Sequence, residues 1–243
     1  MSTKQSHGLV PAKSEPKKVA ICVPSGDMVH ADFAMALAAM AYRCSAFVQD
    51  GRQFTAIPIA MVNTKGSLIV NNRNKLVEEA RTLGVDYILF IDSDVVVHPF
   101  TLRRLLEHDK DIVGATYIQR EEPHRLLGKA IDGRPLDEAI HGVELDTTSL
   151  MEVGALPAGC LLVKMSVFDD MRTPYFQTPV QHAADGTPWI EGEDYFFCRM
   201  ARTHGVDIYL DWATSFALGH VGQRVNTIPT MQVEPEPANA IVH

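Results

Sequence analysis

The chain has 243 residues, 46% of them hydrophobic, which is enough for one large domain or a domain with an appended lobe. Its formal net charge of −8 disfavours a general binder of nucleic acids or anionic membranes, although a local basic groove is compatible with it. Four scattered cysteines lack metal-binding spacing and predict reduced core residues. Neither a signal-peptide pattern nor an apolar stretch of membrane-spanning length is visible, which predicts a cytoplasmic protein.

The first half of the chain alternates between strand-like and helix-like segments. The expected strands are residues 18–24, 54–62, 86–91 and 111–117, and the expected helices are 32–47, 71–83 and 99–107. Such alternation predicts βαβ units, with a parallel sheet and helices on both of its faces.

The second half is less regular. Glycines and a proline interrupt residues 121–151, and short strands are expected there. Beyond them the sequence predicts strands at 160–164 and 206–210 and helices at 166–171 and 193–204. Together these segments predict one domain over residues 18–227, between a disordered N-terminal tail at 1–17 and a disordered C-terminal tail at 228–243.

Two carboxylates follow the apolar strand at 86–91. Asp92 and Asp94 are separated by Ser93, and apolar residues come next. Burying carboxylates is costly unless they are paired or bound to a cation, and oxygen ligands suit Mg²⁺ or Mn²⁺. Because Mg²⁺ usually binds together with substrate phosphates, the pair predicts metal-assisted chemistry on a nucleotide diphosphate. The alternative is a solvated turn in which both side chains bond local backbone donors.

A second candidate loop, Pro24-Ser25-Gly26-Asp27, follows the first expected strand. Ligands of open α/β sheets bind beyond the carboxyl ends of the strands, where this loop and the Asp92 motif both lie. An ordinary strand-to-helix turn explains the same four residues.

The motifs, in this order, resemble the glycosyltransferases of the GT-A fold, in particular the family 2-like members with a DxD motif. The resemblance covers about residues 18–222. It rests on Pro24-Ser25, Asn72-Arg73-Asn74, Asp92-Ser93-Asp94, Gly159-Cys160-Leu161-Leu162-Val163, Glu193-Asp194-Tyr195-Phe196 and Gly219-His220-Val221-Gly222. It implies a Rossmann-like, mixed but mostly parallel sheet flanked by helices, with a nucleotide-binding half at about 18–120 and an acceptor half at about 121–227.

The resemblance also implies roles for individual residues. Asp92, Asp94 and His220 would hold the metal; the alternative for His220 is that it caps a loop or donates to a backbone carbonyl. Asp194, or Glu193 in second place, would be the catalytic base that removes the acceptor proton. The donor nucleotide would be bound by Pro24, Ser25, Gly26, Asp27, Arg73, Asp92 and Ser93. The alternative for Glu193 and Asp194 is that acidic residues are favoured in any first helical turn.

These assignments imply a metal-dependent transfer of a sugar from a UDP- or GDP-sugar to an acceptor hydroxyl, with Mn²⁺ or Mg²⁺ neutralising the diphosphate leaving group. The acceptor could be a glycan, a protein, a small molecule or a modified DNA base. A sugar nucleotidyltransferase is one alternative, but no Gly-rich, Lys- or Arg-containing phosphate loop follows the first strand. A non-catalytic sugar-nucleotide or glycan-binding module of the same fold is another.

Four further features are candidates for substrate contact. Trp189 could stack on an acceptor sugar, although core packing explains it equally well. Glu191 is a further carboxylate that could touch the acceptor. Residues 119–124 could form a flap over the site, and Arg224 could reach the diphosphate.

Overall fold

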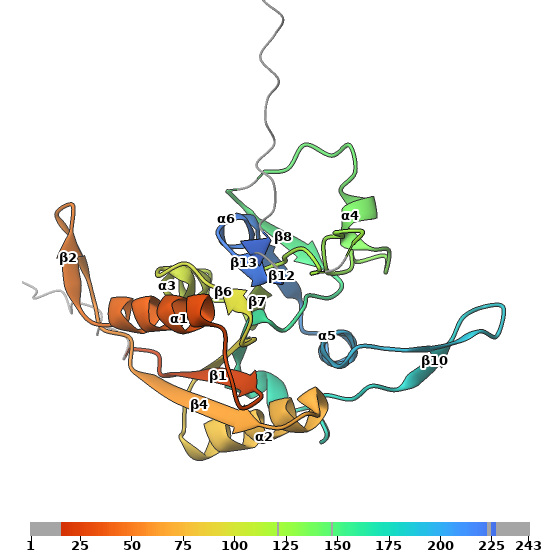
Figure 1. Cartoon of the computed structure of the whole chain (residues 1–243), viewed down its shortest axis with the longest axis horizontal. Coiled ribbons are helices and arrows are strands. Elements are labelled where there is room, and N and C mark those ends of the chain that lie inside the picture. Colours follow the sequence, from red (N-terminus) through yellow and green to blue (C-terminus); the bar gives the residue numbers. More distant parts are fainter. Residues whose placement is uncertain (1–15, 121, 147, 223–224, 227–243) are drawn as a thin grey trace, which may run out of the picture.

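The computed structural model describes residues 16–120, 122–146, 148–222 and 225–226, so the two predicted tails lie almost entirely outside the described residues. A seven-stranded sheet forms the centre of the molecule (Figure 1). In spatial order its strands are β4 (Ile59–Lys65), β1 (Val19–Ser25), β5 (Tyr87–Ile91), β9 (Cys160–Lys164), β7 (Ile112–Gly114), β12 (Ile208–Asp211) and β8 (Leu150–Val153).

Five of these strands run in the same direction. β4, β1 and β5 are parallel neighbours, and β7 and β12 share their direction, whereas β9 and β8 pair antiparallel to their neighbours. This arrangement confirms the predicted mixed, mostly parallel sheet. Since its strands come from both halves of the sequence, one sheet carries residues from both halves.

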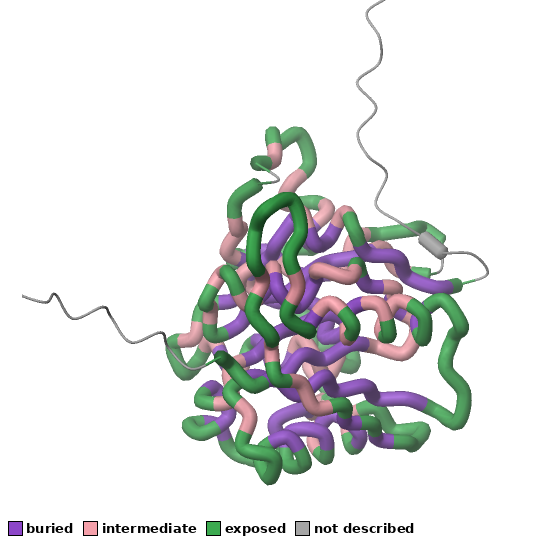
Figure 2. Tube along the Cα trace, turned by 90° about the vertical axis from the view of Figure 1, so that its left-hand side faces the viewer, coloured by how far each residue is buried: buried purple, intermediate pink, exposed green. Residues whose placement is uncertain are grey.

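Helices lie on both faces of the sheet because strand residues alternate between the faces. Odd-numbered residues of β1 and β5 pack with Phe33 and Met40 of α1 (Ala31–Arg43). Even-numbered residues of the same strands pack with Leu76 and Val77 of α2 (Ile69–Thr82). Figure 2 shows the resulting buried centre beneath exposed connecting loops. The four cysteines are buried and free, as the sequence predicted.

The other helices are shorter, and α5 is the longest of them. They are α3 (Thr101–Glu107), α4 (Leu136–Ala139), α5 (Glu193–Thr203) and α6 (Trp212–Phe216), together with the 3₁₀ helix at Met165–Phe168. Among the described residues, no helix is long and apolar enough to cross a membrane.

Three small antiparallel pieces complete the fold. β6 (Val95–Val96), β13 (Gly219–Val221) and β14 (Val225–Asn226) form one sheet, whose register sets His220 opposite Val95. β10 (Val180–His182) pairs with β11 (Pro188–Ile190) in a hairpin that projects from the body of the molecule (Figure 1). β2 (Phe47–Gln49) pairs with β3 (Arg52–Phe54) in a second hairpin.

Several predicted boundaries were wrong, and the second hairpin explains the largest error. The helix expected at 32–47 ends at Arg43, because Phe47 stacks on Phe54 across β2 and β3, with ring centroids 4.5 Å apart. Asp50 and Gly51, both with positive φ, form the turn between these strands. The strand expected at 54–62 is therefore divided between β3 and β4. The strand expected at 111–117 and the helix expected at 166–171 are also shorter, at Ile112–Gly114 and Met165–Phe168.

Candidate active site

The candidate site lies at the carboxyl edge of the sheet. β5 ends at Ile91, so Asp92 is the first residue beyond it. The register that pairs Cys22 with Phe90 brings the end of β1, at Pro24 and Ser25, level with Asp92. The two loops predicted to bind ligand are therefore neighbours in the structure.

A buried arginine joins three segments beneath this edge. Arg73 lies in α2 and its side chain is only 2% exposed. Its Nη2 donates to Asp92 Oδ1 at 2.8 Å, its Nε to Glu193 Oε1 at 3.1 Å, and its Nη1 to the Ala158 carbonyl at 3.3 Å. Although burial by itself lowers the pKa of Arg73, the two carboxylates raise it above its ordinary value. Arg73 therefore orients Asp92 and Glu193, and its predicted contact with a nucleotide stays a prediction.

Replacing Arg73 with Met is expected to lower the free energy of unfolding by about 3–5 kcal/mol, because two partly buried carboxylates lose their shared cation. Chemical denaturation measures this. The control is Arg81→Met on the same helix, whose ion pair with Asp169 is exposed and worth at most about 1 kcal/mol. Equal losses in the two variants would contradict the structural role of Arg73.

Asp94 faces a different set of partners. Its Oδ2 lies 2.9 Å from Arg120 Nη1 and 3.8 Å from His220 Nε2. His220 Nδ1 lies 2.8 Å from the Ile118 carbonyl, which can only accept a hydrogen bond. Nδ1 therefore carries a ring proton, and Nε2 is the ring nitrogen that faces Asp94.

This geometry suits a divalent cation in part. Across the described residues, no three His, Cys, Asp or Glu side chains gather as a ready-made metal site. Asp94 and the Nε2 atom of His220, however, form a two-ligand set that phosphate oxygens of a substrate would complete, as is usual for Mg²⁺. Asp92 is turned toward Arg73, and its predicted metal contact stays a prediction.

Asp194 is held at the start of α5. Its Oδ1 accepts from the Tyr195 amide at 2.8 Å and its Oδ2 from the Ala158 amide at 3.4 Å. Desolvation of the carboxylate, followed by the charge of Glu193, raises the pKa of Asp194 to about 6. A general base works best when its pKa lies near the working pH, and Glu193 is engaged by Arg73. The geometry therefore favours Asp194 over Glu193 as a base.

The raised pKa of Asp194 predicts a stability that depends on pH. The folded protein holds this proton up to pH about 6, whereas the unfolded chain releases it near pH 3.9. The contribution of Asp194 therefore favours folding below pH 4 and is lost as the pH rises through 6, by up to about 3 kcal/mol. The free energy of unfolding is measured for wild type and Asp194→Asn between pH 4 and 8. As the pH rises over this window, the variant should become more stable relative to wild type. A constant difference would contradict the shift.

Tyr117 and Gly159 pack against the carboxylates. The Tyr117 ring meets the His220 ring edge-on, with centroids 4.8 Å apart. Burial, then the charge of Asp92 and of Asp194, raises the pKa of Tyr117, which keeps it a neutral phenol. A Cβ at position 159 would overlap Tyr117 Oη and lie 3.0 Å from Asp92 Oδ2, so the close packing here requires glycine.

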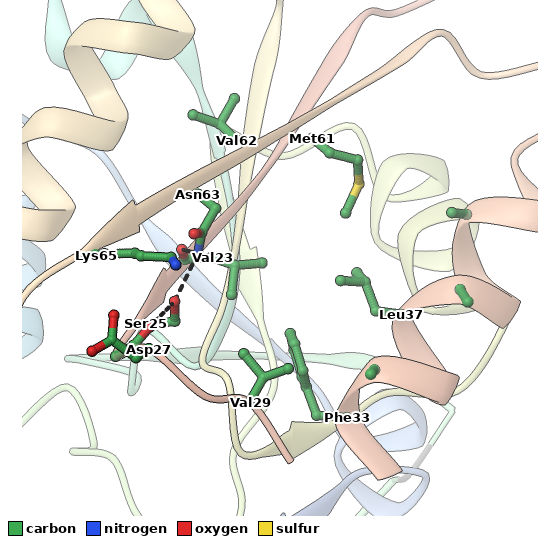
Figure 3. Close-up of a pocket in the computed structure, with 14 residues that line it drawn as sticks. Val23, Ser25, Asp27, Val29, Phe33, Leu37, Met61, Val62, Asn63 and Lys65 are labelled. Atoms are coloured by element: carbon green, nitrogen blue, oxygen red, sulfur yellow. Dashed lines mark hydrogen bonds between the residues drawn. The ribbon is translucent and has the colours of Figure 1, made fainter. Parts of the chain in front are cut away.

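A cavity of about 480 Å³ lies between α1 and the ends of β1 and β4 (Figure 3). Its apolar wall includes Phe33, Leu37 and Met61. Its polar end holds Ser25, Asp27, Asn63 and Lys65. The Asn63 amide donates to Ser25 Oγ at 2.9 Å and to the Val23 carbonyl at 2.8 Å, which fixes this end.

The other predicted residues have varied positions. Pro24 and Ser25 are buried at the end of β1, while Gly26 and Asp27 are exposed and Ser93 is half-buried. Trp189 is 41% exposed, on the projecting hairpin. Glu191 is buried and paired with Arg199 at 2.7 Å, so it is not free to touch an acceptor in this state. Arg120 of the predicted 119–124 flap reaches Asp94, while Arg224 lies outside the described residues.

Sequence reasoning missed Tyr117 and two residues at the polar end of the cavity, Asn63 and Lys65; the other two, Ser25 and Asp27, were predicted. Asn63 and Lys65 lie at the carboxyl end of β4, which runs parallel to β1. Polar residues at the end of that strand were the signal that could have identified them. Tyr117 carries no such signal, because its place beside Gly159 depends on the pairing of β7 with β9.

The sheet order and the position of the site define an α/β protein of the Rossmann-like, GT-A type. The crystal structure of A197 from STIV has a similar fold: the TM-score is 0.53 at 14% identity, over 88% of this chain and 95% of that chain. In all, 119 chains of solved structures are similar to this one. No family model matches the sequence, and no curated protein matches it. At 14% identity, the likeness to A197 shows the fold alone.

Proposed function

We propose that the protein is a metal-dependent glycosyltransferase that moves a sugar from a nucleotide-diphosphate sugar to an acceptor hydroxyl. One observation carries the proposal: the carboxylates of Asp92, Asp94 and Asp194 all lie close enough to Tyr117 to raise its pKa, and His220 packs on the same ring. Residues from three separate sequence motifs thus converge on one point. That point lies at the sheet edge that also carries the cavity of Figure 3.

The cavity suits the nucleoside part of a donor. Phe33, Leu37 and Met61 offer an apolar slot for a flat base, while Asp27 and Lys65 lie at the polar end, available for the ribose. Its volume falls within the roughly 300–1,000 Å³ typical of small-molecule sites. The diphosphate would then extend toward Asp94 and His220.

In the proposed reaction, Asp94 and His220 would hold a divalent cation, Mn²⁺ or Mg²⁺, which would neutralise negative charge on the diphosphate leaving group. Asp194 accepts the proton of the acceptor hydroxyl while the hydroxyl oxygen attacks the anomeric carbon of the donor sugar. Arg73 keeps Glu193 and Asp92 in place beside this base. Tyr117 and Gly159 pack closely against the carboxylates.

Donor binding tests the proposal directly. Thermal unfolding is measured with UDP-, GDP- and CDP-sugars, each with and without Mn²⁺, and release of free nucleotide is followed in parallel. Stabilisation by one nucleotide family only in the presence of metal is expected. Binding without any nucleotide release, whatever the acceptor, would favour the non-catalytic binding module, and no shift with any donor would overturn the proposal.

The Arg120–Asp94 ion pair predicts competition with the metal. The guanidinium occupies the carboxylate oxygen that faces His220, and a partly exposed pair of this kind is worth about 0.2–1 kcal/mol. Arg120→Ala is therefore expected to raise the Mn²⁺ affinity of the nucleotide-free protein about 1.5- to 5-fold. Electron paramagnetic resonance of free Mn²⁺ measures this, with Arg125→Ala, whose exposed pair is with Glu138, as control. Unchanged or weaker Mn²⁺ binding in the Arg120 variant would contradict the competition.

A further inference from the structure

A second cavity lies beside α5, and Tyr195 forms part of its wall. Its volume is about 400 Å³, again within the range of small-molecule sites. It is lined by residues of three segments, which include Lys129, Glu191, Tyr195, Arg199, Arg202 and Thr203. Of the motifs that the proposed function uses, only Glu193-Asp194-Tyr195-Phe196 contributes a lining residue, Tyr195.

The cavity is locally cationic in an acidic protein. Lys129, Arg199 and Arg202 line it, and Glu191 is the one carboxylate among the lining residues. Arg199 is bound to Glu191, and Arg202 donates to the Val153 carbonyl at 3.1 Å and pairs with Glu152 at 3.5 Å. Among the described residues Lys129 forms no direct ion pair; Glu191, whose pKa its charge helps to lower, is paired with Arg199 instead. The Lys129 ammonium is therefore available to an anionic ligand.

Aromatic rings accompany this charge. The ammonium of Lys129 lies 5.3 Å from the centre of the Trp189 ring and 5.3 Å from that of Tyr195. Trp189 belongs to β11, keeps 41% of its surface exposed and lies next to the lining residue Lys129. An exposed flat ring beside a cation provides an apolar face for a sugar ring and a charge for a substituent on it.

The cavity wall is fixed by a buried clamp. Glu191, only 4% exposed, accepts from Arg199 Nε at 3.0 Å, from Arg199 Nη2 at 2.7 Å and from Gln181 at 3.1 Å. Gln181 lies in β10, so this carboxylate ties the projecting hairpin to α5. The Tyr195 hydroxyl also accepts from the Gly128 amide at 2.8 Å. A preformed wall of this kind lowers the ordering cost of binding.

We infer that this cavity binds an acidic sugar unit of the acceptor, one that carries a carboxylate or a phosphate. The inference rests on the proposed function, because Tyr195 follows the candidate base Asp194 directly in the chain. A sugar held in the cavity would place the next unit of the acceptor near Asp194. The net charge of −8 and the small size of the basic set favour a single charged sugar over a nucleic acid.

Intrinsic fluorescence provides the test, because the chain has two tryptophans and Trp212 is buried. The full chain is titrated with glucuronic acid and with glucose 6-phosphate, then with glucose, inorganic phosphate and a single-stranded oligothymidine. A saturable change with either charged sugar, but not with glucose, is expected. Trp189→Phe should remove the signal while leaving that of Trp212.

Matched variants localise the binding. Lys129→Gln and Arg202→Gln together are expected to weaken charged-sugar binding at least tenfold, whereas Lys75→Gln, on the exposed side of α2, should leave it unchanged. Urea denaturation shows that each variant is folded. If the double variant bound charged sugar as tightly as wild type, the inference would be overturned. Tighter binding of glucose, of inorganic phosphate alone or of the oligonucleotide by the wild-type protein would also overturn it.

The test separates this inference from the proposed function. If the double variant bound charged sugar as tightly as wild type while metal-dependent donor binding stayed intact, only the inference about the cavity would be overturned. Saturable binding of charged sugar through Lys129 and Arg202, without any donor binding, would overturn the proposed transfer and leave the cavity as a sugar site.

Discussion

Asp194→Asn is expected to slow sugar transfer about 10²- to 10⁴-fold, the usual contribution of a general base, while donor affinity stays close to that of wild type. Asn has nearly the shape of Asp and can still accept from the Tyr195 amide, which Asp194 bonds at 2.8 Å. It cannot take a proton from the acceptor. Steady-state rates and donor dissociation constants, measured on the same preparations, check the two parts separately.

Asp169→Asn is the control for this variant, because the Asp169 carboxylate is exposed and forms its ion pair with Arg81. Its transfer rate should match that of wild type. If Asp194→Asn retained full transfer, the base would have to be another group, and Glu193 would be the next residue to replace. A large loss of donor affinity in Asp194→Asn would instead assign the residue to donor binding.

Asp94→Ala has the second large expected effect: metal-dependent donor binding is lost and transfer slows by about 10³-fold. The variant removes the carboxylate that faces His220 Nε2 at 3.8 Å, and with it half of the two-ligand set. Mn²⁺-dependent thermal shift and isothermal titration with the nucleoside diphosphate measure the loss. The folded state itself should be little affected, because the closest charged partner of Asp94 is the half-exposed Arg120.

Asp111→Ala controls for removal of a carboxylate near a strand, since its partner Lys164 is also partly exposed. Turnover that still depended on Mn²⁺ in Asp94→Ala would make the metal assignment wrong. Loss of transfer with metal binding intact would instead limit Asp94 to positioning the substrate.

The sequence was most informative where local pattern and chain order suffice. The alternation of strands and helices predicted the sheet and most of its strands, and strand β9 was predicted at its observed bounds. It also predicted that Asp92 would lie just beyond β5 and that Glu193 would open α5. These features depend on residues close in sequence, so a single chain reveals them.

Features that depend on distant packing could not be predicted. The β2–β3 hairpin forms because Phe47, Phe54 and Phe100 gather from separate segments, which local helix preference does not register. The cavity beside Lys129 likewise arises only when α5, the loop before α4 and the residues that follow β8 meet, and the Glu191–Arg199 clamp lies in its wall. Each required the sheet order, which the sequence pattern leaves open.

The bond from Arg73 to Glu193 joins residues 120 positions apart, and the bond from Arg73 to Asp92 spans only 19. Closing the longer loop costs more chain entropy, so the carboxylate of Glu193 is secured only once both halves of the chain have assembled. A fragment that ends before α5 would keep the DxD motif and Arg73 yet leave a buried cation short of one partner. Neither half can mature into a working centre by itself, and a nascent chain would acquire its charge balance only after the second half has emerged.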